Sequence, residues 1–333
     1  MSGTGRPLYG IDSGGSTTSV RASDGGGWDA PSCNPSSVGK DAAARCLSGV
    51  FERIRRHAAR HAGRPAVWLA CAALDPALPR DDVAWLVAQA RSAGLRGDLV
   101  ISNDVTPLVL DVPAGAGHVV AVCGTGAAFV ASDGVSPPCR VGGCEYLGSD
   151  EGSAFDLGLR GLRAAVRGLD GRAEATAVAD LLASTTGATV PELARALARE
   201  PFPKSAVAAL ASVVLHAWQQ GDAAAARLVR DAIGELALGV RAARDAAALR
   251  PGWRLSGAGG VLTGSPEFFG ALAAAATRLG AESARLITDP AMAVLGALGV
   301  LGALAEPAVK LRDRRIGRDA RHVDLDDPGG TAR

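Results

Sequence analysis

The first third of the chain alternates between the hydrophobic periods of strands and helices. Apolar residues at i, i+3, i+4 and i+7 predict amphipathic helices over residues 41–61 and 81–93, the second with Asp81 as its N-cap. Short apolar or alternating runs predict strands over residues 7–12, 17–23, 66–72 and 99–102. This order of elements is typical of an α/β fold.

The same pattern restarts after the Pro/Gly segment 113–117, which is the predicted domain boundary. Further strands are expected over residues 118–123, 127–132, 253–256 and 284–287. The chain from Gly152 to Leu249 is predicted to be mostly helical. We therefore expect two α/β units, each of which opens with a strand and a Gly/Thr turn.

These boundaries divide the chain into a domain over residues 1–112 and a second domain over residues 113–289. Residues 290–305 carry little charge and predict a buried apolar helix. Residues 307–333 mix Arg and Asp without apolar periodicity, so we expect a flexible tail there.

Composition narrows the function classes. The 333 residues carry a formal net charge of +1 without basic blocks, which argues against nucleic acid as the main partner. Residues 291–305 form the nearest approach to a membrane span and are too short, and Met1–Arg6 is not followed by the apolar segment of a signal peptide. We therefore expect a cytoplasmic protein, whose six cysteines form no CxxC pair and are predicted to be small buried apolar residues.

The segment GIDSGGSTT, residues 10–18, places Asp12 at a strand end and a Gly/Ser/Thr turn directly after it. It lacks the GK[ST] of a P-loop and the GxGxxG of a dinucleotide fold, and a strand rather than a helix follows. Such a turn still presents N–H groups and the Ser16 hydroxyl to a phosphate, although many hairpin turns bind nothing. Asp12 is suitably placed to hold Mg²⁺ through water.

A second Gly/Thr turn, CGTGAA, contains Thr125 and occupies the same strand–turn–strand setting in the second unit. Two such turns, one per domain, would be able to grip a polyphosphate. Asp104 follows the predicted strand 99–102, where an acid is able to deprotonate a substrate hydroxyl, or simply to cap the next turn.

Two further glycine-rich segments complete the set. Glu145 and Asp150 lie in GGCEYLGSDEGS, where they suit the hydroxyls of a polyol or act as dipole partners of the following helix, with Ser153 as its cap. SGAGGV, residues 256–261, closes a short strand in a setting where an adenosine is able to lie against bare backbone.

Taken in order, these motifs resemble the N-acetylglucosamine kinase and BadF/BadG/BcrA/BcrD group of the actin–hexokinase–Hsp70 superfamily. The resemblance covers about residues 8–304. Its matching stretches are GIDSGGSTT, Asn34 in CNPSSVG, ISNDV, CGTGAA, GGCEYLGSDEGSAF, HAWQQGDAAAARLVRDA, LSGAGGV and DPAMAVLGALGVLGAL.

The resemblance implies an α/β fold of two ribonuclease-H-like, actin-like ATPase domains around an ATP cleft, with helix 290–306 returning to complete the first domain. It implies a homodimer that uses ATP and Mg²⁺ to phosphorylate a hydroxyl of a sugar or amino sugar. The residues that it assigns to phosphate and adenosine are Ser16, Thr17, Thr125, Gly126, Gly259 and Gly260. Those that it assigns to Mg²⁺, proton transfer and sugar binding are Asp12, Asp104, Asn34 and Asp150.

The departures from the family pattern concern the substrate. Thr18 stands where the family often has Lys, Ala127 replaces a Ser, and Ser149 replaces a Gly. Cys144 and Glu145 stand where N-acetylglucosamine kinases have Trp-Gly. Glu145 is able to pair with a substrate ammonium, which would favour a free amino sugar or an aminocyclitol; a solvated loop acid is the alternative.

Two other functions fit the same resemblance. One is an ATPase that activates a partner redox enzyme and holds an iron–sulfur cluster between two subunits, with Cys123 and Cys139 or Cys144 as the candidate ligands. The other is a sugar sensor without catalytic activity. The sugar-site pattern of Asn34, Asp104 and Asp150 favours the kinase over both.

Overall fold

The computed structural model describes residues 6–15, 17–74, 79–110, 116–201, 203–302 and 320–327. The chain forms two compact units. Unit 1 comprises Met1–Gly115, Gly134–Pro138 and Asp289–Arg333, and unit 2 comprises Ala116–Asp133 and Cys139–Thr288.

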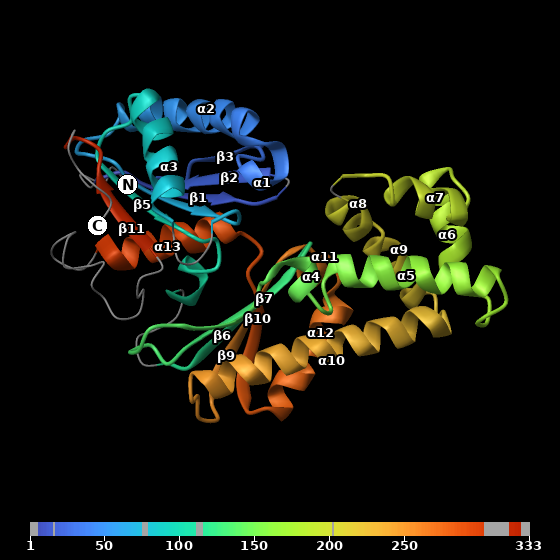
Figure 1. The fold of residues 1–333 in the computed structure, drawn as a ribbon. Coiled ribbons are helices and arrows are strands. Elements are labelled where there is room, and N and C mark those ends of the chain that lie inside the picture. The colour runs from blue at the N-terminus through green and yellow to red at the C-terminus, as the bar shows by residue number, and fades with distance from the viewer. Residues whose placement is uncertain are drawn as a thin grey trace. The chain divides into compact units, whose positions relative to one another are not determined.

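Six of the described strands of unit 1 form a sheet in the order β11-β5-β4-β1-β2-β3 (Figure 1). β1, β4 and β5 are mutually parallel, whereas β2, β3 and β11 run antiparallel to their neighbours. The strands are β1 (Leu8–Ser13), β2 (Thr17–Ala22), β3 (Gly27–Pro31), β4 (Ala66–Cys71), β5 (Asp98–Ser102) and β11 (Ala320–Asp324). The helices are α1 (Pro35–Val38), α2 (Lys40–Ala58), α3 (Arg80–Ser92), the 3-10 helix η1 (Pro107–Leu110) and α13 (Pro290–Gly302).

Helices cover both faces of this sheet, α2 and α3 on one side and α13 on the other (Figure 1). Because both faces are covered, all six residues of β4 are buried. Gly10 lets α13 lie directly against β1: a Cβ at this position would lie 2.5 Å from the Ala291 carbonyl oxygen and the Leu295 nitrogen. The predicted helices and strands of this region are confirmed, but α3 begins after Pro79 and has no side-chain cap, so the expected Asp81 cap is wrong.

The C-terminal strand corrects the expectation of a flexible tail over residues 307–333. Residues 320–324 form β11, which pairs antiparallel with β5, and Val323 and Leu325 are buried in the core of unit 1. His322 Nε2 lies 2.7 Å from Asp98 Oδ1, and Arg64 Nη2 lies 2.5 Å from Asp324 Oδ1. Residues 303–319 and 328–333 lie outside the described residues. β11 covers the edge that β5 would otherwise leave unpaired.

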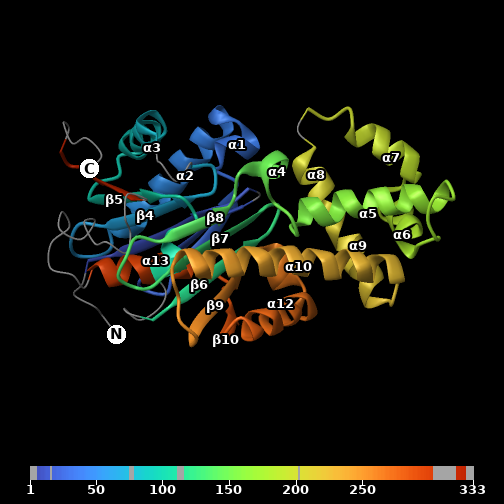
Figure 2. The ribbon, with the colours of Figure 1, turned by 60° about the horizontal axis from the view of Figure 1, so that its bottom comes forward.

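In unit 2 five described strands form a sheet in the order β10-β9-β6-β7-β8 (Figure 2). The strands are β6 (His118–Cys123), β7 (Ala127–Ser132), β8 (Cys139–Gly142), β9 (Trp253–Ala258) and β10 (Ala281–Leu286). The helices are α4 (Glu145–Gly148), α5 (Ala154–Leu169), α6 (Ala177–Thr186), α7 (Val190–Leu197), α8 (Lys204–Ala209), α9 (Ala211–Gln219), α10 (Ala223–Ala246), α11 (Gly260–Gly264) and α12 (Pro266–Arg278). The strands β3 and β8 were not among those expected from the sequence.

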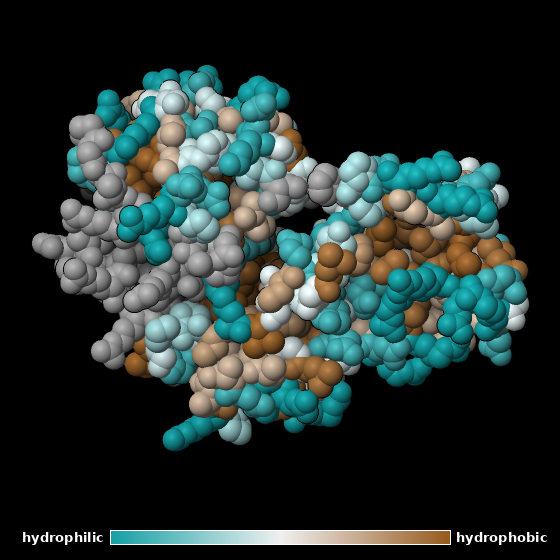
Figure 3. Space-filling view, viewed as in Figure 1, coloured by the Kyte–Doolittle hydropathy of each residue, from teal (hydrophilic) through white to brown (hydrophobic). Residues whose placement is uncertain are grey.

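Unit 2 has its own core between the sheet and the helices α5, α10 and α12. Ser153 caps α5, as expected, because its side chain accepts a hydrogen bond from the Asp156 amide. Figure 3 shows apolar side chains gathered over the helical part of this unit, α5–α9, with polar residues around them. Among the described residues, no helix combines the length and the apolar character that crossing a bilayer requires.

Candidate active site

The carboxyl ends of the parallel strands β1, β4 and β5 meet at one edge of the sheet in unit 1. Asp12 is the penultimate residue of β1, and Asp104 follows two residues after β5. An edge of this kind, outside the carboxyl ends of parallel strands, is where α/β sheets commonly bind ligands. The structure therefore places the two acids that were expected to be functional on one sheet edge.

The turn that carries Asp104 rests on a buried polar scaffold. The Trp68 indole N–H donates to Ser102 Oγ at 2.8 Å, and this hydroxyl in turn donates to the Asn103 carbonyl at 2.8 Å. The Asn103 side-chain amide donates to the Leu74 carbonyl at 2.8 Å and accepts from the Val105 amide at 3.1 Å. These bonds fix the backbone on both sides of Asp104, so its position is set by the strands beneath it.

Asp12 lies near two other acids, Asp104 and Asp289. Burial, and then the negative charges of Asp104 and Asp289, raise the pKa of Asp12 to about 7. Asp289 stands at the start of α13, where its Oδ1 accepts from the Met292 amide at 3.0 Å and its Oδ2 accepts from Arg21 Nε at 2.7 Å. A recessed carboxyl with a raised pKa beside two other carboxylates suits a hard divalent cation, which takes oxygen ligands.

The first Gly/Ser/Thr turn joins β1 to β2. The Gly14 amide donates to the Thr17 carbonyl at 3.0 Å, and the side chain of Thr17 is exposed. Ser16, which was expected to contact phosphate, lies outside the described residues. Thr18 is buried and its hydroxyl accepts from the Cys33 amide at 2.9 Å, so this position packs the following segment against β2.

That segment presents Asn34, the expected sugar-binding residue. The backbone N–H of Asn34 donates to Ser32 Oγ at 3.1 Å. Ser32 Oγ in turn donates to the Gly14 carbonyl of the first turn at 2.9 Å. The backbone carbonyl of Asn34 accepts from the amides of Ser37 and Val38, so Asn34 stands at the start of α1. The two hydrogen bonds of Ser32 therefore connect the Asn34 segment to the first turn within unit 1.

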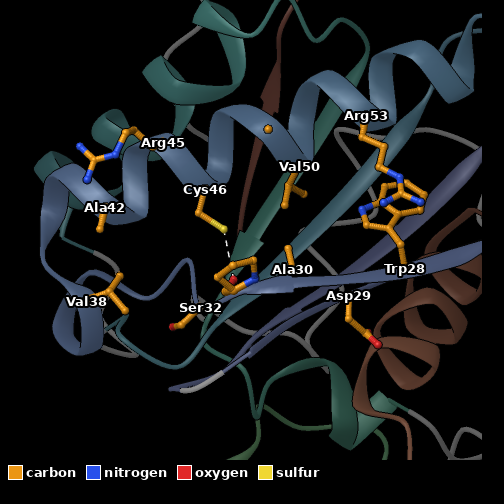
Figure 4. A pocket seen from close by; sticks show the side chains of 12 residues that line it. Trp28, Asp29, Ala30, Ser32, Val38, Ala42, Arg45, Cys46, Val50 and Arg53 are labelled. Carbon is orange, nitrogen blue, oxygen red and sulfur yellow. Dashed lines mark hydrogen bonds between the residues drawn. The ribbon is translucent and has the colours of Figure 1, made fainter.

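A pocket of about 520 Å³ lies beside this segment, between β3 and α2 (Figure 4). It is lined by Trp28, Asp29, Ala30, Pro31, Ser32, Val38, Ala42, Arg45, Cys46, Gly49, Val50 and Arg53. None of the predicted site residues lines it. The Cys46 thiol donates to the Pro31 carbonyl at 3.1 Å, and the Cys33 thiol, beside the pocket, lies 2.6 Å from Cys46 Sγ.

In unit 2 the second turn and the SGAGGV segment lie against each other. A Cβ on Gly259 would lie 2.5 Å from the Cys123 carbonyl oxygen, and a Cβ on Gly124 would lie 3.8 Å from the Gly260 nitrogen. Gly259 has φ of +93°, which side chains disfavour. The segment expected to bind phosphate, residues 123–128, and the segment expected to bind adenosine, residues 256–261, therefore lie side by side. We call the backbone around Thr125, Gly126 and Gly260 the glycine cradle.

This cradle is bonded to the start of α5 and to Asp150. The amides of Ala154 and Phe155 donate to the carbonyls of Gly124 and Thr125 at 2.9 and 3.2 Å. Asp150 Oδ1 accepts from the Ala127 amide at 2.8 Å, and a Cβ on Gly126 would lie 2.6 Å from both Asp150 carboxylate oxygens. Asp150 is 4% exposed and has φ of +76°, a strained conformation for a residue other than glycine.

Lys204, at the start of α8, supplies the positive charge of this site. Its Nζ lies 3.0 Å from Asp150 Oδ2 and 2.7 Å from Glu145 Oε2. Both carboxylates raise the pKa of Lys204, against the effect of burial. Glu145, which was expected to be available to a substrate ammonium, thus already has an ammonium partner from its own chain.

Three residues that shape these sites, Asp289, Lys204 and Asn103, were not predicted from the sequence. Asp289 had a signal, because Asp-Pro begins the closing helix, but nothing in the sequence pointed it toward Asp12. Lys204 is one of three lysines in the chain, and its distance of more than fifty residues from Asp150 hid the pairing. Asn103 stands next to Asp104 and was overlooked as the residue that positions it.

Comparison with known proteins agrees with this arrangement. A model of the BadF/BadG/BcrA/BcrD ATPase family matches residues 9–269. An N-acetylmuramic acid/N-acetylglucosamine kinase of Clostridium acetobutylicum is 28% identical over 153 residues, which are 46% of this chain and 50% of that protein. The match thus spans about half the length of this curated relative.

Solved structures show the fold. A provisionally named N-acetylglucosamine kinase from Chromobacterium violaceum matches 89% of this chain and 100% of its own with a TM-score of 0.65 and 23% identity. One from Porphyromonas gingivalis has a TM-score of 0.67 at 17% identity over 88% of this chain and 98% of its own. A ROK family glucokinase from Streptomyces griseus, in complex with glucose and AMPPNP, has a TM-score of 0.57 at 14% identity, with coverages of 88% and 98%. The expected actin-like ATPase fold is confirmed.

Proposed function

This chain belongs to the BadF/BadG/BcrA/BcrD ATPase family, and from its site we propose that it is an ATP-dependent kinase of a sugar or amino sugar. The observation that carries the proposal is the acid pair at one sheet edge, Asp104 on a rigid turn beside the recessed Asp12. A base held at a strand end beside an acid that suits a metal ion is the arrangement that phosphoryl transfer to a hydroxyl requires.

In this proposal Asp104 is the general base. It accepts the proton of the acceptor hydroxyl as the hydroxyl oxygen attacks the γ-phosphorus of ATP. The bond from that phosphorus to the bridging oxygen of ADP breaks, and ADP leaves. Because the scaffold of Asn103 and Ser102 fixes the Asp104 turn, little reorganisation accompanies the transfer.

The nucleotide is assigned to the glycine cradle of unit 2 and to Thr17 of the first turn. Thr125, Gly126, Gly259 and Gly260 offer backbone without side chains, where N–H groups are able to approach phosphate and adenosine. Mg²⁺ fits the donor set of Asp12 and its acidic neighbours, and when bound it would neutralise charge on the phosphates.

Asn34, Asp104 and Asp150 are assigned to the sugar hydroxyls. Glu145 remains the candidate for a contact with a substrate amine, but its ion pair with Lys204 argues for a different preference. A substrate ammonium would have to displace Lys204 from Glu145. We therefore infer that the site prefers a neutral or N-acetylated sugar to a free amine or an aminocyclitol.

The buried state of Cys123 weighs against the activator of a redox enzyme. This thiol is 0% exposed, burial raises its pKa, and it faces the Gly152 carbonyl at 3.5 Å. A cluster shared between two subunits requires thiolates at a surface.

The test is ADP release with Mg-ATP over a panel of N-acetylglucosamine, N-acetylmuramic acid, glucosamine, N-acetylmannosamine, glucose and aminocyclitols. We expect one sugar to accelerate ADP release strongly and the N-acetyl form to exceed its free amine. ATP turnover without acceptor dependence would contradict the kinase, and a preference for the free amine would contradict the role given to Lys204. A homodimer in the cytoplasm belongs to the same proposal, and light scattering tests the oligomeric state.

A further inference from the structure

The turn between β2 and β3 meets the end of α2 in a group of three potential metal ligands. Asp24 Oδ2 lies 3.2 Å from His61 Nε2 and 3.4 Å from His57 Nε2, and the ligand atoms of the three residues all lie within 4.8 Å of one another. His57 is in the last turn of α2 and His61 lies just beyond the end of this helix, with the centroids of the two rings 5.2 Å apart. We propose that Asp24, His57 and His61 bind a divalent transition metal, with Zn²⁺ as the best-fitting ion.

The spacing of the ligand atoms suits a tetrahedral ion. Zn²⁺ binds imidazole nitrogen and carboxylate oxygen at about 2.0–2.2 Å, which separates two ligands of a tetrahedron by about 3.3 Å. The two distances from Asp24 agree with this separation. Two imidazoles and one carboxylate favour Zn²⁺ and its neighbours over Mg²⁺ or Ca²⁺, and all three residues reach solvent, which leaves room for water as a fourth ligand.

Neighbouring groups orient two of the three ligands, His57 and Asp24. Tyr9 Oη lies 2.9 Å from His57 Nδ1, and a contact at this second ring nitrogen orients the imidazole so that Nε2 faces the site. The Gly26 amide donates to Asp24 Oδ1 at 2.9 Å, which leaves Oδ2 for the metal.

Gly26 also keeps the space open. A Cβ at this position would lie 3.0 Å from Asp24 Oδ1 and 3.4 Å from His57 Nε2. On the other side, the His57 ring packs beside the Trp28 ring with centroids 6.1 Å apart, and Arg53 lies 4.5 Å above Trp28. The site is therefore built from the hairpin turn, α2 and β1 together.

This location gives the metal a structural role. The β2–β3 turn lies at the opposite end of β2 from the Gly14–Thr17 turn of the candidate active site. A bound ion would clamp the hairpin to the end of α2 and stabilise the folded form of unit 1 by mass action. The inference is independent of the kinase proposal.

The experiment titrates tag-free, metal-stripped protein with Zn²⁺ by calorimetry at about pH 7.5, without nucleotide or Mg²⁺. We expect one equivalent to bind and to raise the melting temperature. The variants His61→Ala and Asp24→Asn should weaken this binding by more than about tenfold, and Tyr9→Phe by about tenfold. His216→Ala, which removes an exposed histidine of α9, is the matched control and should bind as the wild type does.

Two further readouts keep the result independent of variant folding. Binding to the wild type should weaken as the pH is lowered from about 7.5 to 5.5, because protonated imidazoles do not ligate. Co²⁺ should give the visible absorption of a tetrahedral site, which Zn²⁺ then removes. Absence of Zn²⁺ binding to the wild type, or equal binding to His61→Ala, would overturn the proposal.

Discussion

Asp12 of unit 1 and Asp150 of unit 2 are both recessed aspartates beside a glycine turn, but the charges around them differ in sign. Asp12 faces Asp104 and Asp289, and burial with these neighbours raises its pKa to about 7. Asp150 accepts from the Ala127 amide at 2.8 Å and pairs with Lys204 at 3.0 Å.

The difference separates an aspartate that lies near further negative charges from an aspartate that has a lysine partner within the fold. A carboxylate without a cationic partner in a recessed place is costly, and such positions are common where a ligand supplies the missing charge. In unit 2 the fold itself supplies a cation, because Lys204 Nζ lies 3.0 Å from Asp150 Oδ2. We expect the two aspartates to respond differently to substitution, pH and added cations.

The largest effect is expected at Asp104. Replacement of Asp104 with Asn removes the base while keeping the shape of the side chain, so kcat should fall by about 10²–10⁴-fold. ATP affinity, measured by calorimetry, should stay near that of the wild type, since the nucleotide is assigned to other residues. Turnover close to that of the wild type would contradict the role of Asp104.

The second prediction concerns pH and Asp12. The pKa of Asp12 is raised in the folded chain, so the folded form binds the proton more tightly than the unfolded form does. The stability that this gives is full below about pH 4 and is lost as the pH rises through about 7. Urea unfolding of the wild type and of Asp12→Asn should show the wild type losing on the order of 2–4 kcal/mol relative to the variant between about pH 4 and 8.

Parallel pH curves for these two proteins would show that Asp12 is solvated like a surface acid.

Added Mg²⁺ offers a further test of the difference between Asp12 and Asp150. It should stabilise the wild type more at about pH 8 than at about pH 5, because only the ionised carboxyl binds it, and Asp12→Asn should remove this dependence.

The smallest effect is expected at Lys204. Replacement with Gln leaves the buried Asp150 charge without its cation, which should lower the free energy of unfolding by about 1–3 kcal/mol. The KM for the sugar should rise, because Asp150 loses one of the contacts that hold it. As a control, Arg172→Gln breaks the exposed pair of Arg172 with Asp170 and should leave stability unchanged. Equal effects of the two substitutions would show that the Lys204 pair is an ordinary surface contact.

Most of the fold was predictable because local signals agreed with each other. The 3.6-residue period of residues 41–61 and the apolar run of 66–72 became α2 and β4, with each end within three residues of the prediction. The edge strands β3 and β8 escaped prediction because edge strands are short and only half buried, which weakens their pattern. β11 escaped for another reason: its five residues are stabilised by pairing with β5, more than two hundred residues away.

The sequence alone determined the order of the motifs, the two-unit architecture and the candidate residues Asp12, Asp104 and Asp150, because these depend on local composition and on chain order. Only the tertiary structure decided how the charges pair. It placed Asp289 near Asp12, Lys204 between Asp150 and Glu145, and Asp24 beside His57 and His61. Pairings of this kind join residues from separate elements, and electrostatic interaction depends on distance in space rather than along the chain.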